Sequence, residues 1–177
     1  GDLYKIAMDS VKLNQDGVAP IQAELKEIGA LQSKEQLYPL LAQLYKKGIA
    51  AYLALYVAAD EMNSNMNAVQ IAQYGLSMGD RDYYLLDDEA TTKIREAFKV
   101  HVKKMFGLAG YSDADADRAV KVVMDVETRL AQAFRSRVDL RDPHANYNKM
   151  SMEDIKKQYP TFDWDASVSY THLTLPT

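Results

Sequence analysis

Residues 73–85, with the sequence Q-Y-G-L-S-M-G-D-R-D-Y-Y-L, constrain the fold more than any other part of the chain. This segment fits neither the period of a helix face nor that of a strand. Its glycines, Gly75 and Gly79, allow backbone conformations that other residues rarely adopt. Its charged and aromatic residues include Asp80, Arg81, Asp82 and Tyr83. Because the two carboxylates flank the guanidinium closely enough to hold it, the pattern predicts a loop of defined shape.

A second segment, residues 136–164, is equally dense in specific residues and reads S-R-V-D-L-R-D-P-H-A-N-Y-N-K-M-S-M-E-D-I-K-K-Q-Y-P-T-F-D-W. Its distinctive residues include Arg137, Arg141, Asp142, Pro143, Tyr147 and Asn148. The first segment resembles the glycine-leucine and arginine-aspartate-tyrosine-tyrosine signature in the N-terminal half of neprilysin-family zinc metallopeptidases. The second is similar to the family's R-x-D-P, Y-N-K-M-[ST] and F-x-W segment. Two matches in the family's order are difficult to obtain by chance. We call them the first and second signature segments.

The resemblance implies a peptidase whose zinc is held by H-E-x-x-H on one helix and by a glutamate of E-x-x-x-D on the next. Neither motif occurs in this sequence. The three histidines, His101, His144 and His172, are never four residues apart, and no glutamate is followed by an aspartate four positions later. We therefore expect no catalytic residue and no metal ligand here. Zinc would be bound by the full-length protein, and peptide substrates would be reached through its missing catalytic half.

We interpret residues 1–166 as the incomplete N-terminal helical region of such a peptidase and residues 167–177 as a non-native tail. The chain opens in an amphipathic pattern without an initiator methionine, so we expect a truncated start. Residues 168–177 depart from the family pattern and are similar to a translated sequencing adaptor, with Ser167 as the expected junction. The alternative is a threonine-rich strand or a flexible tail that belongs to the protein.

Composition excludes several classes of function. The chain has 177 residues, 47% of them hydrophobic, which is enough for one domain with a substantial core. Its net charge of -4, with both signs interspersed, argues against nucleic acid as a partner. The absence of cysteine excludes disulfides and cysteine-zinc sites. The longest apolar run, residues 49–59, is too short to span a membrane. For localisation, the resemblance implies the cell envelope, the periplasm or secretion.

Helix start and stop signals divide most of the chain into helices. Pro20 suits the first turn of a short helix, and Ser33 with Gln36 matches a capping box for the next helix, which Gly48 should end. Further along, aspartates at 87 and 88 precede a long amphipathic helix that should close at one of the glycines 107 and 110.

Two more helices follow in the prediction. Ser112 should cap a second long helix, which we expect to pack as a hairpin against the one before it. Ser151 should open a last short helix that must stop near Pro160.

Residues 49–73 are ambiguous, because their alanines favour a helix while Leu53, Leu55 and Val57 alternate with the period of a strand. The segment 63–67 is rich in turn formers. We therefore predict one β-hairpin with strands at about residues 51–59 and 68–73, which the resemblance also implies. The expected fold class is mainly α, a multi-helix body with this one hairpin.

Single residues offer few candidate sites. His101 falls on or beside an apolar helix face, which is typical of a packing histidine, and His144 is expected in a solvated turn. Asp113, Asp115 and Asp117 lack the glycine and distal glutamate of a calcium loop, so we interpret them as carboxylates at a helix N-terminus.

The arginines of the two signature segments are the more informative charges. We expect them to pair with neighbouring aspartates and to lock the two signature segments in shape rather than to contact substrate. The residues concerned are Arg81, Arg135, Arg137 and Arg141, with Asp80, Asp82, Asp139 and Asp142. In some family members an arginine in the turn after the first helix receives the carboxylate end of a peptide. The corresponding turn here offers Asp16, so the resemblance favours an endopeptidase or oligopeptidase.

The sequence therefore predicts the non-catalytic N-terminal portion of a zinc metalloendopeptidase that acts on short peptides, forming part of the chamber around the substrate. The alternative is a non-enzymatic helical binding or scaffold module.

Overall fold

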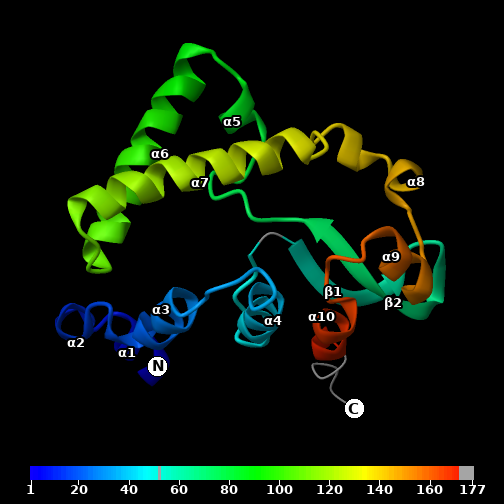
Figure 1. Cartoon of the computed structure of the whole chain (residues 1–177), viewed down its shortest axis with the longest axis horizontal. Helices are drawn as coiled ribbons and strands as arrows, with labels where there is room; N and C mark the ends of the chain where they lie inside the picture. The colour runs from blue at the N-terminus through cyan, green and yellow to red at the C-terminus, as the bar shows by residue number, and fades with distance from the viewer. Residues whose placement is uncertain (52, 172–177) are drawn as a thin grey trace.

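The computed structural model describes residues 1–51 and 53–171, and within them the chain is mainly helical with one antiparallel hairpin, as predicted (Figure 1). The elements before the hairpin are α1 (Asp2–Ala7), α2 (Ser10–Asp16), η1 (Ala19–Ile21), α3 (Gln22–Gly29) and α4 (Leu37–Lys46). The hairpin consists of β1 (Leu53–Asp60) and β2 (Asn63–Gln73). It is followed by α5 (Asp82–Leu85), α6 (Glu89–Leu108), α7 (Asp113–Ala133), η2 (Asp139–Arg141), α8 (Pro143–Asn146), α9 (Met152–Gln158) and α10 (Trp164–Thr171).

One packed region joins α4, α10 and β1. Helix α4 buries Leu40, Leu41 and Leu44 on the face that meets α10, where Trp164 and Val168 are buried. The Trp164 indole N–H donates to a backbone carbonyl at 3.0 Å, which satisfies the polar atom of this large side chain. These contacts place the end of the second signature segment against a helix that precedes the hairpin.

A second packed region joins α5, α6 and α7. Side chains buried there are Tyr84 of α5, Val102 of α6, and Ala116 and Ala131 of α7. Helices α6 and α7 pack against each other across a short turn, as predicted (Figure 1). The predicted cap of α7 is confirmed, because the Ser112 side chain accepts a hydrogen bond from a backbone amide at 3.2 Å. The Asp88 side chain caps α6 in the same way at 3.0 Å.

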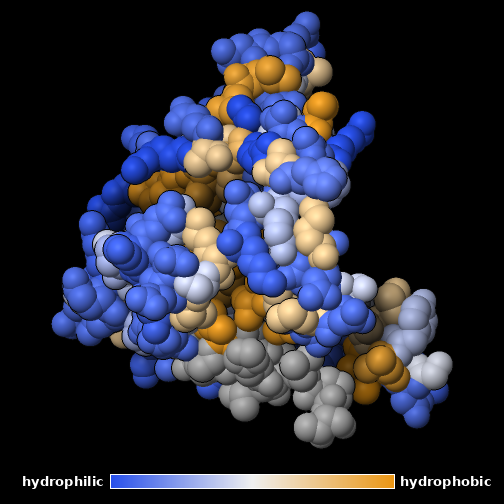
Figure 2. Space-filling model, turned by 90° about the vertical axis from the view of Figure 1, so that its right-hand side faces the viewer, coloured by the Kyte–Doolittle hydropathy of each residue, from blue (hydrophilic) through white to orange (hydrophobic). Residues whose placement is uncertain are grey.

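The first two helices are amphipathic but bury nothing among the described residues. Leu3, Ile6 and Leu13 are 83%, 69% and 57% exposed. Figure 1 shows α1 to α3 at the far end of the molecule from the hairpin and α8 to α10. Figure 2 shows that hydrophobic residues also reach the surface in separate patches on the face that it displays. The predicted apolar stripe of α1 and α2 is therefore present without a partner in the described residues.

The capping box predicted at Ser33 is wrong. Helix α4 begins at Leu37, and the Gln36 side chain accepts a hydrogen bond from the Gln32 amide at 2.8 Å. Because this contact closes a turn before the helix, residues 33–36 lie outside it. The predicted end is confirmed, since Gly48 has a φ of 79° and the Ile49 amide donates to the Leu44 carbonyl at 2.9 Å.

The predicted hairpin is confirmed, but its second strand begins earlier than the predicted residue 68. Strand β2 already begins at Asn63, and the turn consists of Glu61 and Met62. Leu55 pairs with Ile71, and a register irregularity follows Ala59. Asn63 pairs with Asp60 and Asn67 with Ala59, so the exposed residues 64–66 lie in the irregularity between these two pairs.

The predicted tail begins inside α10. Ser167 and Val168 are buried in this helix, whereas residues 172–177 lie outside the described residues. The predicted boundary at residue 167 therefore stays a prediction. In the part of the chain that the structure describes, no helix has the length and apolar character needed to cross a membrane.

Candidate functional site

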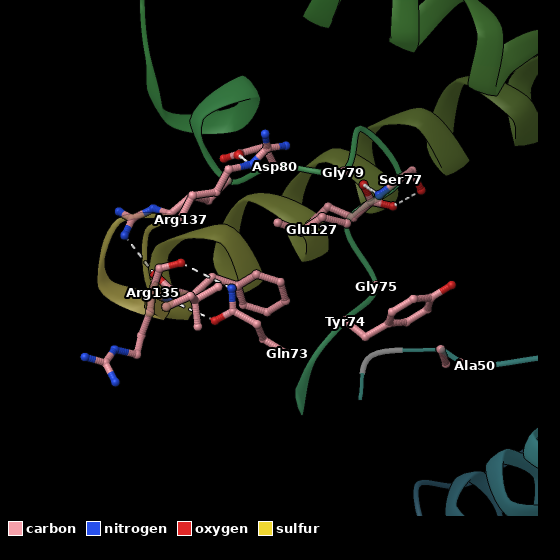
Figure 3. Close-up of a pocket in the computed structure, with 15 residues that line it drawn as sticks. Ala50, Gln73, Tyr74, Gly75, Ser77, Gly79, Asp80, Glu127, Arg135 and Arg137 are labelled. Carbon is pink, nitrogen blue, oxygen red and sulfur yellow. Dashed lines mark hydrogen bonds and ion pairs between the residues drawn. The ribbon is translucent and has the colours of Figure 1, made fainter. Parts of the chain in front are cut away.

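A cavity of about 640 Å³ lies where the first signature segment meets the end of α7 (Figure 3). Its walls come from the end of β2 and the loop after it, from α7, and from the start of the second signature segment. Residues that bring chemistry to the cavity are Ser77, Asp80, Arg81, Glu127, Arg135 and Arg137. The two signature segments, far apart in sequence, therefore share one site.

The loop depends on glycine at the two predicted positions. Gly75 and Gly79 have φ values of 104° and 80°, which residues with a Cβ rarely adopt. The Gly79 amide donates to the Leu76 carbonyl at 2.9 Å and closes a tight turn. The interpretation of this segment as a loop of defined shape is confirmed.

Glu127 of α7 is the buried anchor of the loop. Its carboxylate accepts from the Ser77 amide at 3.1 Å and from the Ser77 hydroxyl at 2.7 Å (Figure 3). It also accepts from the Tyr84 hydroxyl, and both burial and this carboxylate raise the pKa of Tyr84. Glu127 was missed by the sequence analysis. The sequence did contain a signal, because Glu127 lies one helical turn after Val123 and so places a charged residue on the apolar face of the predicted helix.

The expected pairing of Arg81 with Asp80 and Asp82 is wrong. Arg81 donates from one terminal nitrogen to the Phe134 carbonyl at 2.8 Å, and its buried Nε has no partner among the described residues. Carbonyls at the end of a helix lack intrahelical partners, so the end of α7 attracts this cation.

Asp80 instead forms an ion pair with Arg137, which joins the two signature segments. The Asp80 carboxylate also accepts from the Asp82 amide at 2.9 Å, which shapes the start of α5. Asp80 therefore has other partners than the predicted Arg81, and the locking role of these charges stays a prediction.

Arg135 connects β2 to the second signature segment. Its backbone amide donates to the Gln73 side chain at 3.0 Å, and that side chain donates back to its carbonyl at 3.2 Å (Figure 3). The guanidinium donates to the Ala145 carbonyl at 2.9 Å and the Asn146 side chain at 2.6 Å. Arg135 therefore fixes the path of the chain after α7.

Asp60 at the end of β1 is held by two residues of the second signature segment. Its buried carboxylate accepts from the Tyr147 hydroxyl at 2.9 Å and the Lys149 ammonium at 2.6 Å. Lys149 and then the Met62 amide lower the pKa of Asp60 to about 2. Asp60 and Lys149 were missed by the sequence analysis, because their partners are almost ninety positions apart.

The other predicted signature residues have local structural contacts. The Tyr83 carbonyl accepts from Arg95 at 3.4 Å, and the Asn148 side chain donates to the Asn146 carbonyl at 3.0 Å. Asp142 caps α8, whose first residue is Pro143. Arg141 is exposed in η2. Asp142, Pro143 and Asn148 shape the second signature segment. The structural role expected of the signature residues stays a prediction.

The described residues do not fit a zinc site. Within residues 1–51 and 53–171, no group of three or more histidine, aspartate or glutamate side chains is placed to hold a metal ion. His144 is exposed at the start of α8, as expected for a solvated turn, while His172 lies outside the described residues. The prediction of a packing histidine at position 101 is wrong, because His101 is exposed on α6.

Comparison with known sequences assigns the chain to a class of enzymes. A sequence profile described as Peptidase family M13 matches residues 1–176. Endothelin-converting enzyme 1 from Mus musculus is 25% identical over 170 residues, which are 91% of this chain and 22% of that protein. Endothelin-converting enzyme-like 1 from Rattus norvegicus is 33% identical over 118 residues, 65% of this chain and 15% of that protein.

Solved structures share the fold. A zinc metalloprotease, Zmp1, from Mycobacterium tuberculosis in complex with an inhibitor matches with a TM-score of 0.87 and 28% identity, over 97% of this chain and 26% of that one. PepO from Lactobacillus rhamnosis matches with a TM-score of 0.72 and 20% identity, over 83% of this chain and 23% of that one.

The profile match covers nearly the whole sequence, so this chain belongs to peptidase family M13. It corresponds to an N-terminal portion of family members and spans about a quarter of the length of the relatives it matches. The predicted family is confirmed.

Proposed function

We propose that this chain is the non-catalytic N-terminal portion of a zinc-dependent metalloendopeptidase that hydrolyses short peptides. In this proposal it builds part of the chamber that encloses the substrate and excludes large proteins. The observation that carries the proposal is the backbone similarity to the mycobacterial zinc metalloprotease over 97% of this chain. The shared cavity of the two signature segments supports it, because a chamber wall needs loops held in a fixed shape.

The chemistry belongs to the remainder of the proposed enzyme. Because the described residues do not fit zinc, the proposal assigns both the metal and the activation of water to sequence outside this chain. This chain contributes part of the chamber wall, including the loops of the two signature segments. An envelope, periplasmic or secreted location is part of the same proposal.

The second candidate function is a helical binding or scaffold module without catalysis. The observation that favours it is that the described residues contain no set of side chains placed to hold a metal. A gene that continues in frame into H-E-x-x-H supports the peptidase, whereas a natural stop soon after residue 166 supports the module.

The decisive experiment expresses the complete reading frame that contains this chain. The purified protein should hydrolyse short peptides much faster than a folded protein that contains the same peptide sequences. A zinc chelator should abolish the activity. This chain alone is the matched control, and it should neither hydrolyse peptides nor bind zinc at submicromolar concentration in calorimetric titration. Activity that resists chelation, or equal cleavage of folded proteins, contradicts the proposed function.

A further inference from the structure

We propose that one side of the α6–α7 hairpin is a docking surface for an apolar segment of the complete protein that lies outside this chain. We call this side the outer face and define it by its exposed apolar residues, Ile94, Met105, Leu108, Val122 and Val126. The inference needs the remaining part of the polypeptide, but it does not depend on peptidase activity.

An ion pair between the two helices shows how each of them is turned. Lys103 of α6 and Asp117 of α7 pair at 2.7 Å across the hairpin, so both residues face the same side. Each residue of the outer face is two, five or nine positions from Lys103 or Asp117 in its own helix, which is roughly 140–180° around the helix axis. The five apolar residues therefore share the opposite side of the hairpin.

The outer face is apolar and exposed in this chain. Its five side chains are between 45% and 60% exposed. His101, which is also exposed, lies one helical turn before Met105 and belongs to the same stripe. Another side of α6 buries Val102 in the packed region with α5 and α7. A helix that is apolar on two sides is typical of one covered by more than one neighbour.

The length of the relatives indicates what covers the outer face. This chain spans 22% of the mouse endothelin-converting enzyme 1 and 26% of the mycobacterial zinc metalloprotease. Most of a family member is therefore sequence that this chain does not contain. An apolar stripe gains nothing by facing the water of a chamber, whereas packing against another segment removes its area from water. We therefore assign the outer face to a segment of the same polypeptide.

Cysteine labelling tests the proposal, because this chain contains no cysteine of its own. Met105→Cys and Val126→Cys each place a thiol on the outer face, one on each helix. Glu96→Cys is the control, since Glu96 is 61% exposed on α6 and lies nine residues before Met105, on the side of Lys103. Each variant is made in this chain and in the complete reading frame, and its rate of reaction with a maleimide is measured at low protein concentration.

In this chain, the three thiols should react at rates within about threefold of one another, because all three positions are exposed. In the complete protein, the two thiols of the outer face should react at least about tenfold more slowly, while the control thiol keeps its rate. The complete protein without an added cysteine supplies the background rate. Circular dichroism verifies that each variant folds, and the thiol on the second helix serves if the first variant does not.

Three results would overturn the proposal. An unchanged rate in the complete protein for a folded outer-face variant shows that the face stays open. Protection that grows with the concentration of the complete protein assigns the face to a second copy. Protection already present in this chain at low concentration shows that the chain covers the face itself. No hydrolysis is measured, so the zinc-dependent activity of the complete protein succeeds or fails in a separate test.

Discussion

The Tyr84 hydroxyl donates a hydrogen bond to the Glu127 carboxylate and at the same time accepts one from the Met78 amide at 3.0 Å. Tyr84 lies in α5 and Glu127 in α7, so one phenol joins the end of the first signature segment to its loop and to a long helix. Both residues are buried, at 4% and 9% exposure. These buried hydrogen bonds therefore hold the loop of the first signature segment in place, away from competing water.

Replacing Tyr84 by phenylalanine should lower the free energy of unfolding by about 1–3 kcal/mol, because the buried carboxylate and the Met78 amide both lose a partner. Urea unfolding measures the change. Tyr111→Phe is the control, since Tyr111 is 42% exposed and packs edge-to-face against Phe106, and it should change stability by less than about 0.5 kcal/mol. Equal midpoints for the two variants would contradict the anchoring role.

Asp60 should make stability depend on acid pH. Its pKa is about 2 in the folded chain, below the ordinary value of about 3.9 for an unfolded one. A lowered folded pKa contributes stability above about pH 4, and this contribution is lost as the pH falls towards 2. Thermal midpoints from pH 6 to pH 2 should therefore fall less steeply in Asp60→Asn than in the parent.

The control for this profile is Asp2→Asn, because the Asp2 side chain is 97% exposed. It should keep the parental slope. A parental slope in Asp60→Asn as well would mean that other carboxylates dominate the acid sensitivity.

Gly79→Ala should destabilise the chain by about 1–2 kcal/mol through backbone strain. Its φ is 80°, and an added Cβ would meet no atom within 4 Å, so no steric clash contributes. Gly107→Ala provides the matched control in helix α6, where the new Cβ also meets nothing within 4 Å. That change should stabilise the chain by about 0.5–1 kcal/mol, and opposite signs in urea unfolding are the expected result.

Arg81→Ala should lower stability by about 1.5–3 kcal/mol, because the Phe134 carbonyl loses a charged donor. In the complete protein, kcat/KM for a short peptide should fall together with the thermal midpoint. Arg118→Ala is the control, since its side chain is 77% exposed and pairs only with a neighbour on the same helix. A large kinetic loss at unchanged stability would assign Arg81 to substrate contact instead.

The exposed stripe of α1 and α2 should cause this chain to self-associate. Leu3 and Ile6 are 83% and 69% exposed, and contiguous apolar surface of this kind promotes association. Light scattering over a concentration series should show a rising mean mass, which the double change Leu3→Ser and Ile6→Ser reduces. Lys5→Ser on the same helix should leave the rise unchanged. A monomer at every concentration would favour the independent module.

Local signals predicted much of the fold, since each depends on neighbours in sequence. Ser112 and Asp88 begin their helices because their side chains satisfy amides three residues ahead. The glycines at 75 and 79 were identified because positive φ is a property of a single residue. The exact start of the second strand was not predicted, because the pairing of Asn63 with Asp60 depends on the opposite strand and not on the turn propensity of residues 63–67.

The sequence by itself determined the helical class, the hairpin and the resemblance that the profile match confirmed, because these depend on short-range patterns and ordered motifs. Only the tertiary structure decided the partners of the charges. Arg81 donates to the end of α7, Asp80 pairs with Arg137, and Lys149 reaches Asp60. An ion pair or hydrogen bond forms only where two groups are close in space, and closeness in sequence does not ensure this. Arg81 therefore donates to the carbonyl at the end of α7 and not to the neighbouring Asp82.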